Sequence, residues 1–202
     1  MAQNAQSLLH DLLPAAEGKG RYLQRDYWAA ILACACEPTE LVTAVRARFP
    51  EFAPAELAEF RRRNDSRAPL TQGDELDVNI AMVGQCAVRV VHCSSQSLTL
   101  ATLRGHPEAG RITFGAYRNP CGDVIFHIRS RARSGSSLMY AGFLAAGEAM
   151  QTNTWTDFIS AVAHTFGDGV IGFIHSETRA IALEEPSEEL LCAPTFRAVG
   201  DK

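Results

Sequence analysis

The hydrophobic period of this chain changes twice along its length, and no other feature limits its possible folds as strongly. Residues 7–60 carry apolar side chains about every 3.6 positions, as on one face of a helix. Residues 76–131 instead alternate between apolar and polar side chains, which indicates strands with one wet face. Residues 137–166 return to the helical period. Helices, then an antiparallel sheet, then one long helix predict an α+β fold.

Helical segments are expected throughout residues 1–70, before the sheet begins. One of them has Tyr27, Trp28 and Ile31 at helical spacing. Three arginines at 61–63 are expected to end the last one, where cations suit the negative end of the helix dipole; an anion-binding patch is the alternative. The expected segments are Ser7–Leu13, Asp26–Cys36, Pro38–Phe49 and Pro54–Phe60.

The alternating part of the chain predicts an antiparallel meander. Its connections are short, whereas parallel neighbours need a crossover of about a dozen residues or more. The long helix is then the obvious cover for the apolar face of the sheet, and a sheet curved around a helix can leave a cavity for a small ligand. The expected strands are Leu76–Met82, Cys86–His92, Leu98–Leu103, Arg111–Tyr117 and Asp123–Arg131.

We expect a single domain spanning residues 1–202. Its parts are a helical N-terminal part (1–70), the sheet with the long helix (73–166), and a hairpin and tail (167–202). The expected hairpin consists of Val170–His175 and Arg179–Leu183, and the acidic, proline-containing tail after it is expected to be loosely attached.

Composition and charge exclude several classes of protein. With 47% hydrophobic and 21% charged residues, the chain is too apolar to be intrinsically disordered. A net charge of −4 argues against nucleic-acid binding through broad electrostatics. No apolar run reaches the roughly 20 residues of a membrane span, and residues 1–6 do not resemble a signal peptide. We therefore expect a cytoplasmic protein with no nucleic-acid partner and no membrane span.

The six cysteines follow no metal-binding or disulfide pattern. None belongs to a CxxC pair, and a chain of this length needs no disulfide scaffold. Cys34 and Cys36 lie two positions apart in an expected helix, so they should point to different faces. We expect reduced thiols, no metal and no cofactor.

Residues 98–114 are the most distinctive stretch, because a strand runs into a Gly-His-Pro-Glu turn at 105–108 and a glycine leads into the next strand. This stretch resembles the signature of an uncharacterised family of bacterial and plant domains, the domain of unknown function 1990. The resemblance implies a START-like (SRPBCC) helix-grip fold, shared with lipid-transfer and pollen-allergen domains: a curved antiparallel sheet around a long C-terminal helix. It implies no established activity. Further matches are Gly73–Leu76, Cys86–His92, Phe126–Ser134 and Gln151, with a looser one at Arg25–Trp28.

His106 and Glu108 are the candidate catalytic residues. Proline disfavours the helical region for the residue before it, so His106 is extended, and an extended Glu108 would project to the same side. An imidazole held by a carboxylate has a raised pKa and suits a proton shuttle or a substrate anchor. The alternative is structural: one of the two side chains bonds to the backbone of the turn, whose glycines permit its tight geometry.

The last expected strand offers a second group, because His127, Arg129 and Arg131 share one face. That face is either the solvated outside of the sheet, or Arg129 points into the cavity. A buried guanidinium there would need a carboxylate or an anionic ligand. Glu148 and Gln151, three positions apart on the long helix, would be its partners.

These features support three hypotheses about function. In the first, a small hydrophobic or amphipathic molecule binds between the sheet and the long helix. In the second, the same scaffold is an acid–base enzyme of the cyclase, dehydratase or isomerase type. In the third, it is a structural or interaction protein with a filled core, possibly a homodimer. The expected ligand-binding residues are Arg129, Gln151, Tyr140, Phe143, Trp155, Phe114 and Met150, with Met82 and Phe158 as further lining.

Overall fold

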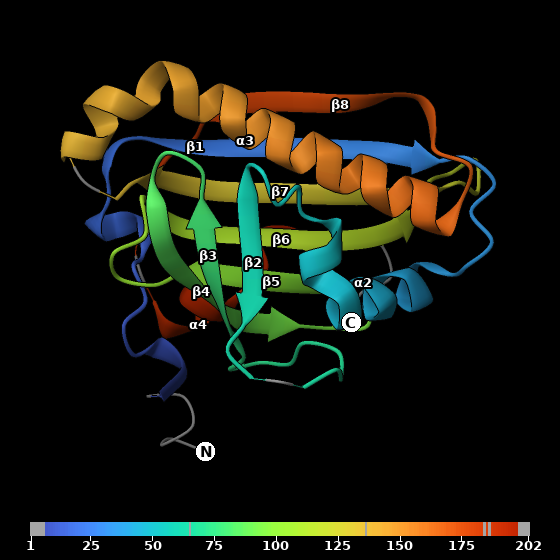
Figure 1. Cartoon of the computed structure of the whole chain (residues 1–202), viewed down its shortest axis with the longest axis horizontal. Coiled ribbons are helices and arrows are strands. Elements are labelled where there is room, and N and C mark those ends of the chain that lie inside the picture. The colour runs from blue at the N-terminus through green and yellow to red at the C-terminus, as the bar shows by residue number, and fades with distance from the viewer. Residues whose placement is uncertain (1–6, 65, 136, 184, 186, 198–202) are drawn as a thin grey trace.

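A curved sheet of eight antiparallel strands forms the frame of the fold, and helix α3 (Ser137–Phe166) lies across its concave face (Figure 1). The computed structural model describes residues 7–64, 66–135, 137–183, 185 and 187–197, without the side chains of residues 137–148. The strand order is β2-β3-β4-β5-β6-β7-β1-β8. The strands are β1 (Lys19–Ile31), β2 (Ala58–Arg62), β3 (Glu75–Ile80), β4 (Gly84–Cys93), β5 (Ser97–Thr102), β6 (Glu108–Arg118), β7 (Val124–Ser134) and β8 (Val170–Ala180).

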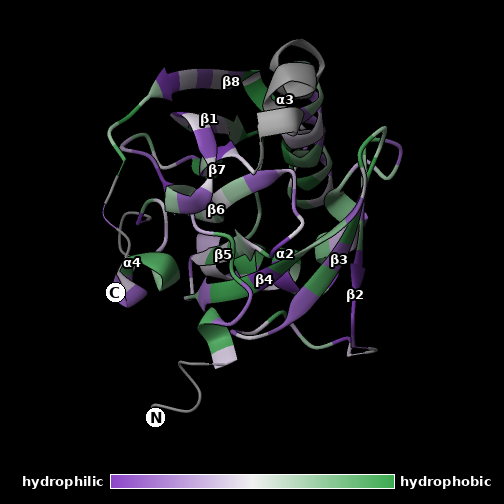
Figure 2. Cartoon of the chain, turned by 90° about the vertical axis from the view of Figure 1, so that its left-hand side faces the viewer, coloured by the Kyte–Doolittle hydropathy of each residue, from purple (hydrophilic) through white to green (hydrophobic). Residues whose placement is uncertain are grey.

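Helices cover both faces of this sheet. Seen from the side, α3 and α2 (Pro38–Phe52) lie within the curve, and the short α4 (Glu188–Cys192) lies outside it (Figure 2). The concave core is built on aromatic side chains from three elements. Phe49 of α2, Phe114 of β6 and Phe158 of α3 have ring centroids 4.9–5.2 Å apart. Each is almost fully buried, so this contact fixes both helices against the sheet.

The predicted sheet-and-helix part of the chain is confirmed. Each of the five expected strands corresponds to one of β3 to β7, and every neighbouring pair is antiparallel. The long helix forms as expected, and α2 begins at Pro38, whose missing N–H costs nothing in a first turn. Glu37 and Glu40 form a capping box at its start.

The helix expected at Asp26–Cys36 is wrong, because this region belongs to β1 and the loop after it. Strand β1 pairs with β7 on one side and β8 on the other. Most of its residues from 22 to 31 are buried, since structure covers the sheet on both faces. Because residues 27–31 form an unbroken apolar run without polar–apolar alternation, the apolar residues of β1 also fit a helical period.

Two further expectations fail at the edges of the sheet. Residues 58–62 form the edge strand β2 rather than the end of a helix, with Ala58 and Phe60 facing inward. The expected terminal hairpin is instead one strand, β8, paired along β1. Nor is the described part of the tail loose: α4 and residues 193–196 pack on the convex face.

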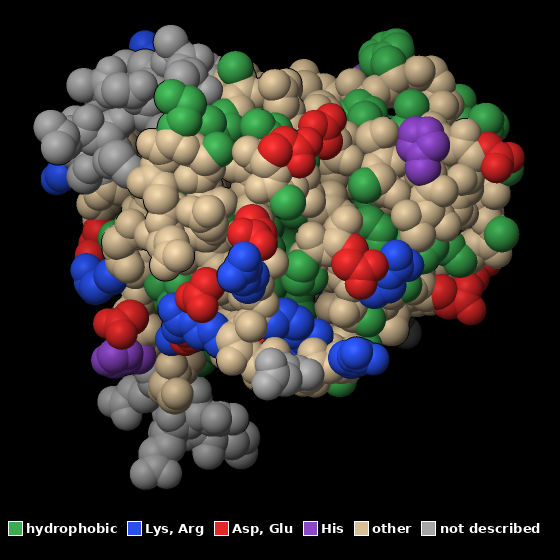
Figure 3. Space-filling view, viewed as in Figure 1, with side chains coloured by type: hydrophobic (Ala, Val, Ile, Leu, Met, Phe, Trp, Pro, Cys, Tyr) green, Lys and Arg blue, Asp and Glu red, His purple; other side chains and the backbone are tan. Residues whose placement is uncertain are grey.

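The three arginines at 61–63, at the end of β2 and just after it, are all paired with carboxylates. Figure 3 shows basic and acidic side chains interleaved on this face of the molecule. Arg61 bonds Glu59 at 2.8 Å, Arg62 lies 3.5 Å from Asp74, and Arg63 bonds Asp77 at 2.7 Å. These charges are neutralised within the protein, so the anion-binding alternative finds no support here.

Cys34 and Cys36 lie in the loop after β1, with sulfur atoms 3.6 Å apart. The prediction that they point to different faces is therefore wrong, because it depended on a helix that does not form. Within the described residues, no group of three or more His, Cys, Asp or Glu side chains is placed to hold a metal ion. The same part of the chain contains no helix with both the length and the apolar character of a membrane span.

Candidate ligand-binding pocket

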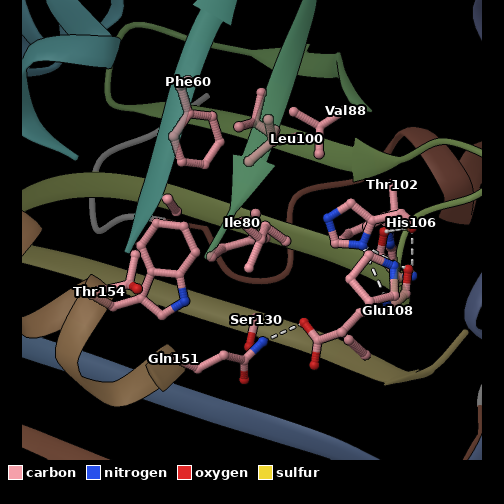
Figure 4. A pocket seen from close by; sticks show the side chains of 18 of the residues that line it. Phe60, Ile80, Val88, Leu100, Thr102, His106, Glu108, Ser130, Gln151 and Thr154 are labelled. Carbon is pink, nitrogen blue, oxygen red and sulfur yellow. Dashed lines mark hydrogen bonds between the residues drawn. The ribbon is translucent and has the colours of Figure 1, made fainter. Parts of the chain in front are cut away.

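A pocket of about 90 Å³ lies between the concave face of the sheet and α3. The pocket is partly open to solvent. Strands β2 to β7 form its floor and walls, and one turn of α3 forms its roof. Figure 4 shows Phe60, Ile80 and Leu100 on one side, with Glu108, Ser130 and Gln151 on another. Its apolar lining comprises Ala58, Phe60, Val78, Ile80, Val88, Leu100, Pro107, Ile112, Ala132, Met150 and Trp155.

The Gly-His-Pro-Glu turn reaches this pocket at the start of β6. Gly105 has a φ of +93°, and the His106 backbone N–H donates to the Leu103 carbonyl at 3.0 Å, which closes the turn. The His106 ring Nδ1 lies 3.0 Å from the backbone N of Glu108, whose N–H donates to it. The imidazole therefore braces the backbone of the turn and is not bonded to the Glu108 carboxylate, as the structural alternative proposed.

Burial lowers the pKa of His106 to about 4, only partly opposed by its hydrogen bond with the Glu108 backbone. The expected raised pKa is wrong. That expectation required the carboxylate beside the ring, whereas the ring faces the backbone amide. His106 is thus neutral near pH 7. Its Nδ1 lies 3.0 Å from both the backbone N and the carbonyl oxygen of Glu108, and the carbonyl contact is the one that opposes the lowering of the pKa.

Glu108 bonds to two other elements instead. Its Oε2 accepts a hydrogen bond from the Gln151 side-chain amide of α3, and its Oε1 lies 3.4 Å from Nη1 of Arg25 on β1. Burial raises the pKa of this carboxyl group, while the charge of Arg25 and the Gln151 hydrogen bond oppose the rise. The pocket therefore has a polar end where the turn, β1 and α3 meet.

Arg25 is the functional candidate that sequence reasoning missed. In the register of the sheet it lies opposite Ser130 on β7, and Glu108 lies opposite Ser134 farther along the same strand. Small residues at Ser130, Ala132 and Gly110 leave room for the Arg25 side chain to pass over β7 toward Glu108. The stretch Arg25-Asp26-Tyr27-Trp28 was noted in the sequence, but its residues were expected to begin a helix. That assignment conceals which of these residues share a face of a strand.

Among the described residues, three buried polar atoms at this end have no hydrogen-bond partner. They are Nε of Arg25, Oγ of Ser130 and Oε1 of Gln151. The residues Arg25 and Ser130 are only 6% and 4% exposed. Because buried polar groups are nearly always paired, these atoms are candidates to bond a water molecule or a ligand.

The expected ligand-binding residues divide into four groups. Met150, Gln151 and Trp155 line the pocket from α3. Phe114 and Phe158 belong to the packed aromatic core beside it. Met82 is 95% exposed in the turn after β3, so its assignment to the lining is wrong. The side chains of Tyr140, Phe143 and Glu148 lie outside the described residues.

Arg129 lies on the opposite face of the sheet, and its assignment to the pocket is wrong. Ser130 and Ala132 face the pocket, so the alternation of β7 directs Arg129 to the convex side. There it donates from Nε to Asp26 Oδ1, and His127 Nε2 lies 2.7 Å from the same oxygen. Burial would raise the pKa of Asp26, but the bonds with His127, Arg129 and Gln24 outweigh it and hold the pKa at about 2.

The C-terminal segment covers this convex cluster. The Phe196 ring stacks on His127 with centroids 4.4 Å apart, and the Arg129 guanidinium lies 5.5 Å from the same ring. Thr195 donates its N–H to Thr113 Oγ1 and its hydroxyl to the Arg129 carbonyl, each at 2.8 Å. The cluster is a structural anchor for the tail, on the side of the sheet away from the pocket.

The curved sheet gripping a long C-terminal helix over a pocket defines the helix-grip class. The family model described as a domain of unknown function (DUF1990) matches residues 24–161, well over half of the sequence, and the chain belongs to this family. No curated protein matches the sequence.

Solved structures agree on the fold. Truncated norcoclaurine synthase from Thalictrum flavum is 7% identical, with a TM-score of 0.51 over 73% of this chain and 96% of that one. The KanY protein is 8% identical, with a TM-score of 0.54 over 73% of this chain and 99% of that one. At such identities the likeness shows the helix-grip fold alone.

Proposed function

We propose that this protein binds a small hydrophobic or amphipathic molecule in the pocket between the sheet and α3. The observation that carries the proposal is an apolar pocket with one polar end. A packed protein interior has few voids larger than a water molecule, whereas this one contains a pocket of about 90 Å³ that is partly open to solvent. Ligand pockets have this combination of apolar walls with a few placed polar groups.

A neutral fluorophore that brightens in apolar surroundings, N-phenyl-1-naphthylamine, tests the proposal. Ala132 lies in the pocket wall on β7, so Ala132→Leu fills the space with carbon atoms. Ala149 is exposed on α3, so Ala149→Leu is the matched control. The fluorophore should brighten with the wild type and the control but at least tenfold less with Ala132→Leu at an unchanged fold by circular dichroism. Equal brightening with all three would overturn the proposal.

One observation favours a second candidate function, that of an acid–base enzyme. The Glu108 carboxyl group is buried at the polar end of the pocket and its pKa is raised, which suits a general acid or base. Acetophenone in D₂O tests this candidate, because a positioned base would exchange the hydrogens next to its carbonyl. The enzyme candidate expects exchange above the buffer rate that Glu108→Gln abolishes. A wild-type rate equal to that of buffer counts against it.

A further inference from the structure

Three unpartnered atoms of different bonding character lie around the polar end of the pocket, two on the lining residues Ser130 and Gln151 and one on Arg25 beside it. Together they describe what they would bind. We propose that the ligand buries a neutral group that both donates and accepts hydrogen bonds, a hydroxyl or a primary carboxamide, at Arg25, Ser130 and Gln151. This inference rests on the proposed function and names the chemical class of the molecule bound there.

The bonding character follows from the contacts already made. The Gln151 amide nitrogen donates to Oε2 of Glu108, so the free Oε1 of Gln151 is an acceptor that needs a donor. The free Nε of Arg25 is a donor that needs an acceptor. The Ser130 hydroxyl serves as either. A ligand group that only donates would leave the Arg25 donor without a partner. A ligand group that only accepts would leave the Gln151 acceptor without one.

Charge balance requires that the group be neutral. Arg25 and Glu108 already face each other at 3.4 Å, both nearly buried, so their charges offset one another. An anion entering here would meet the Glu108 carboxylate, and a cation would meet the Arg25 guanidinium. Either would also lose its hydration in an apolar pocket, which is costly for an unpaired ion.

The space sets the size of the buried part. Cavities of about 150 Å³ hold a benzene-sized molecule, and the pocket here is smaller, about 90 Å³. It therefore holds the polar group and a few carbon atoms. The rest of the molecule would extend along Trp155 and Phe60 toward the open side of the pocket.

Five probes with one benzene ring and different substituents test this class: phenol, benzamide, benzene, benzoate and benzylamine. Their dissociation constants are measured at pH 7 by saturation-transfer NMR titration. We expect phenol and benzamide to bind roughly tenfold tighter than benzene, since leaving buried groups unpaired costs about this factor or more. Benzoate and benzylamine, which are charged at this pH, should bind more weakly than benzene.

Substitutions test whether the preference for phenol over benzene arises at the polar end of the pocket. Ser130→Ala removes only the hydroxyl and should lower phenol affinity severalfold while leaving benzene affinity unchanged. Gln151→Met keeps the length of the side chain and should do the same. Ser176→Ala on the exposed strand β8 is the matched control and should change neither affinity.

The results of these titrations test the proposed ligand class separately from the proposed function, which is the binding of an apolar molecule. Equal affinity for all five probes, tighter binding of benzoate, or no binding of phenol and benzamide would each overturn the proposed class. The fluorophore test above shows independently whether the pocket takes any apolar molecule, so the proposed function stands or falls on that result.

Discussion

Arg25 and Glu108 meet beside the pocket although they are 83 positions apart in the sequence, with Nη1 of Arg25 3.4 Å from Oε1 of Glu108. The pair joins the start of β6 to β1, and Gln151 adds α3 to the same carboxylate. One buried carboxyl group thereby ties together the three elements that enclose the polar end.

The two members of this pair should respond differently to substitution. Glu108→Gln leaves the Arg25 charge buried without a partner, and arginine cannot lose its proton, so we expect a loss of about 3 kcal/mol in the free energy of unfolding. Arg25→Met leaves a carboxyl group whose pKa burial already raises, and which can take up a proton, so the loss should be about 1 kcal/mol.

Urea denaturation of both variants and of the double variant measures this asymmetry. The double variant should be more stable than Glu108→Gln alone, because it removes the unpaired charge. Equal losses in the two single variants would contradict an ion pair in this place. If Glu108→Gln abolishes fluorophore binding with unchanged stability, the carboxylate acts on the ligand and not on the fold.

The His106 imidazole should stay neutral down to unusually low pH. Its pKa of about 4 lies well below the ordinary value of about 6.5, which the unfolded chain is expected to show. As the pH falls from 6.5 to 4, the unfolded chain therefore binds a proton that the folded chain does not, and His106 makes folding progressively less favourable. The Cε1 proton shift followed by NMR between pH 3 and pH 8 gives the pKa, with His106→Asn identifying the signal. A midpoint above 6 would show that the ring is not held in this buried turn.

Gly110 should tolerate no side chain, because of the close approach of β7. A Cβ added there would overlap the Arg131 carbonyl oxygen and the Ala132 backbone. Gly110→Ala should therefore cost more than about 3 kcal/mol, as a severe core overlap does. Gly122 has a φ of +91° with open space around it, so Gly122→Ala should cost only about 1 kcal/mol of backbone strain. Thermal unfolding compares the two, and similar costs would contradict the tight β6–β7 contact.

Asp26 should contribute to stability at neutral pH and not in strong acid. Its pKa of about 2 lies below the ordinary value, so its contribution is present above about pH 4 and is lost as the pH falls through 2. Asp26→Asn should lower the free energy of unfolding by about 2 kcal/mol at pH 7 and by much less at pH 2. Because the cluster lies on the convex face, the variant should bind the fluorophore as the wild type does. If Asp26→Asn lost fluorophore binding without losing stability, the convex cluster would influence the pocket, which would contradict this account.

The middle of the fold was predictable because polar and apolar side chains alternate along its strands, even in β5, where all six residues are buried. Strands β3 to β7 therefore show the alternation that a sequence reveals, and α3 shows the helical period. Strand β1 does not, since its residues 27–31 form one unbroken apolar run. The tail gave no signal, because Thr195 and Phe196 are held by particular contacts rather than by a periodic apolar face.

The pocket was predictable only in part for the same reason. Met150, Gln151 and Trp155 follow from the period of α3, and His106 and Glu108 follow from their motif. Their partners do not follow, because the register of β1 against β7 decides which residue faces Glu108. The sign of the His106 pKa shift also depends on burial, which a motif does not disclose.

The two tryptophans allow one measurement that tests the central claim, because they lie on opposite faces of the sheet. Trp155 lines the pocket, whereas Trp28 stacks on His175 with ring centroids 4.8 Å apart on the convex side. A ¹⁵N-labelled protein titrated with phenol reports on both indole N–H signals in one spectrum. If phenol binds between the sheet and α3, the Trp155 signal and the Gln151 side-chain amide shift together and the Trp28 signal stays in place. Shifts at Trp28 alone, or at neither indole up to the solubility limit of phenol, would contradict ligand binding in this pocket.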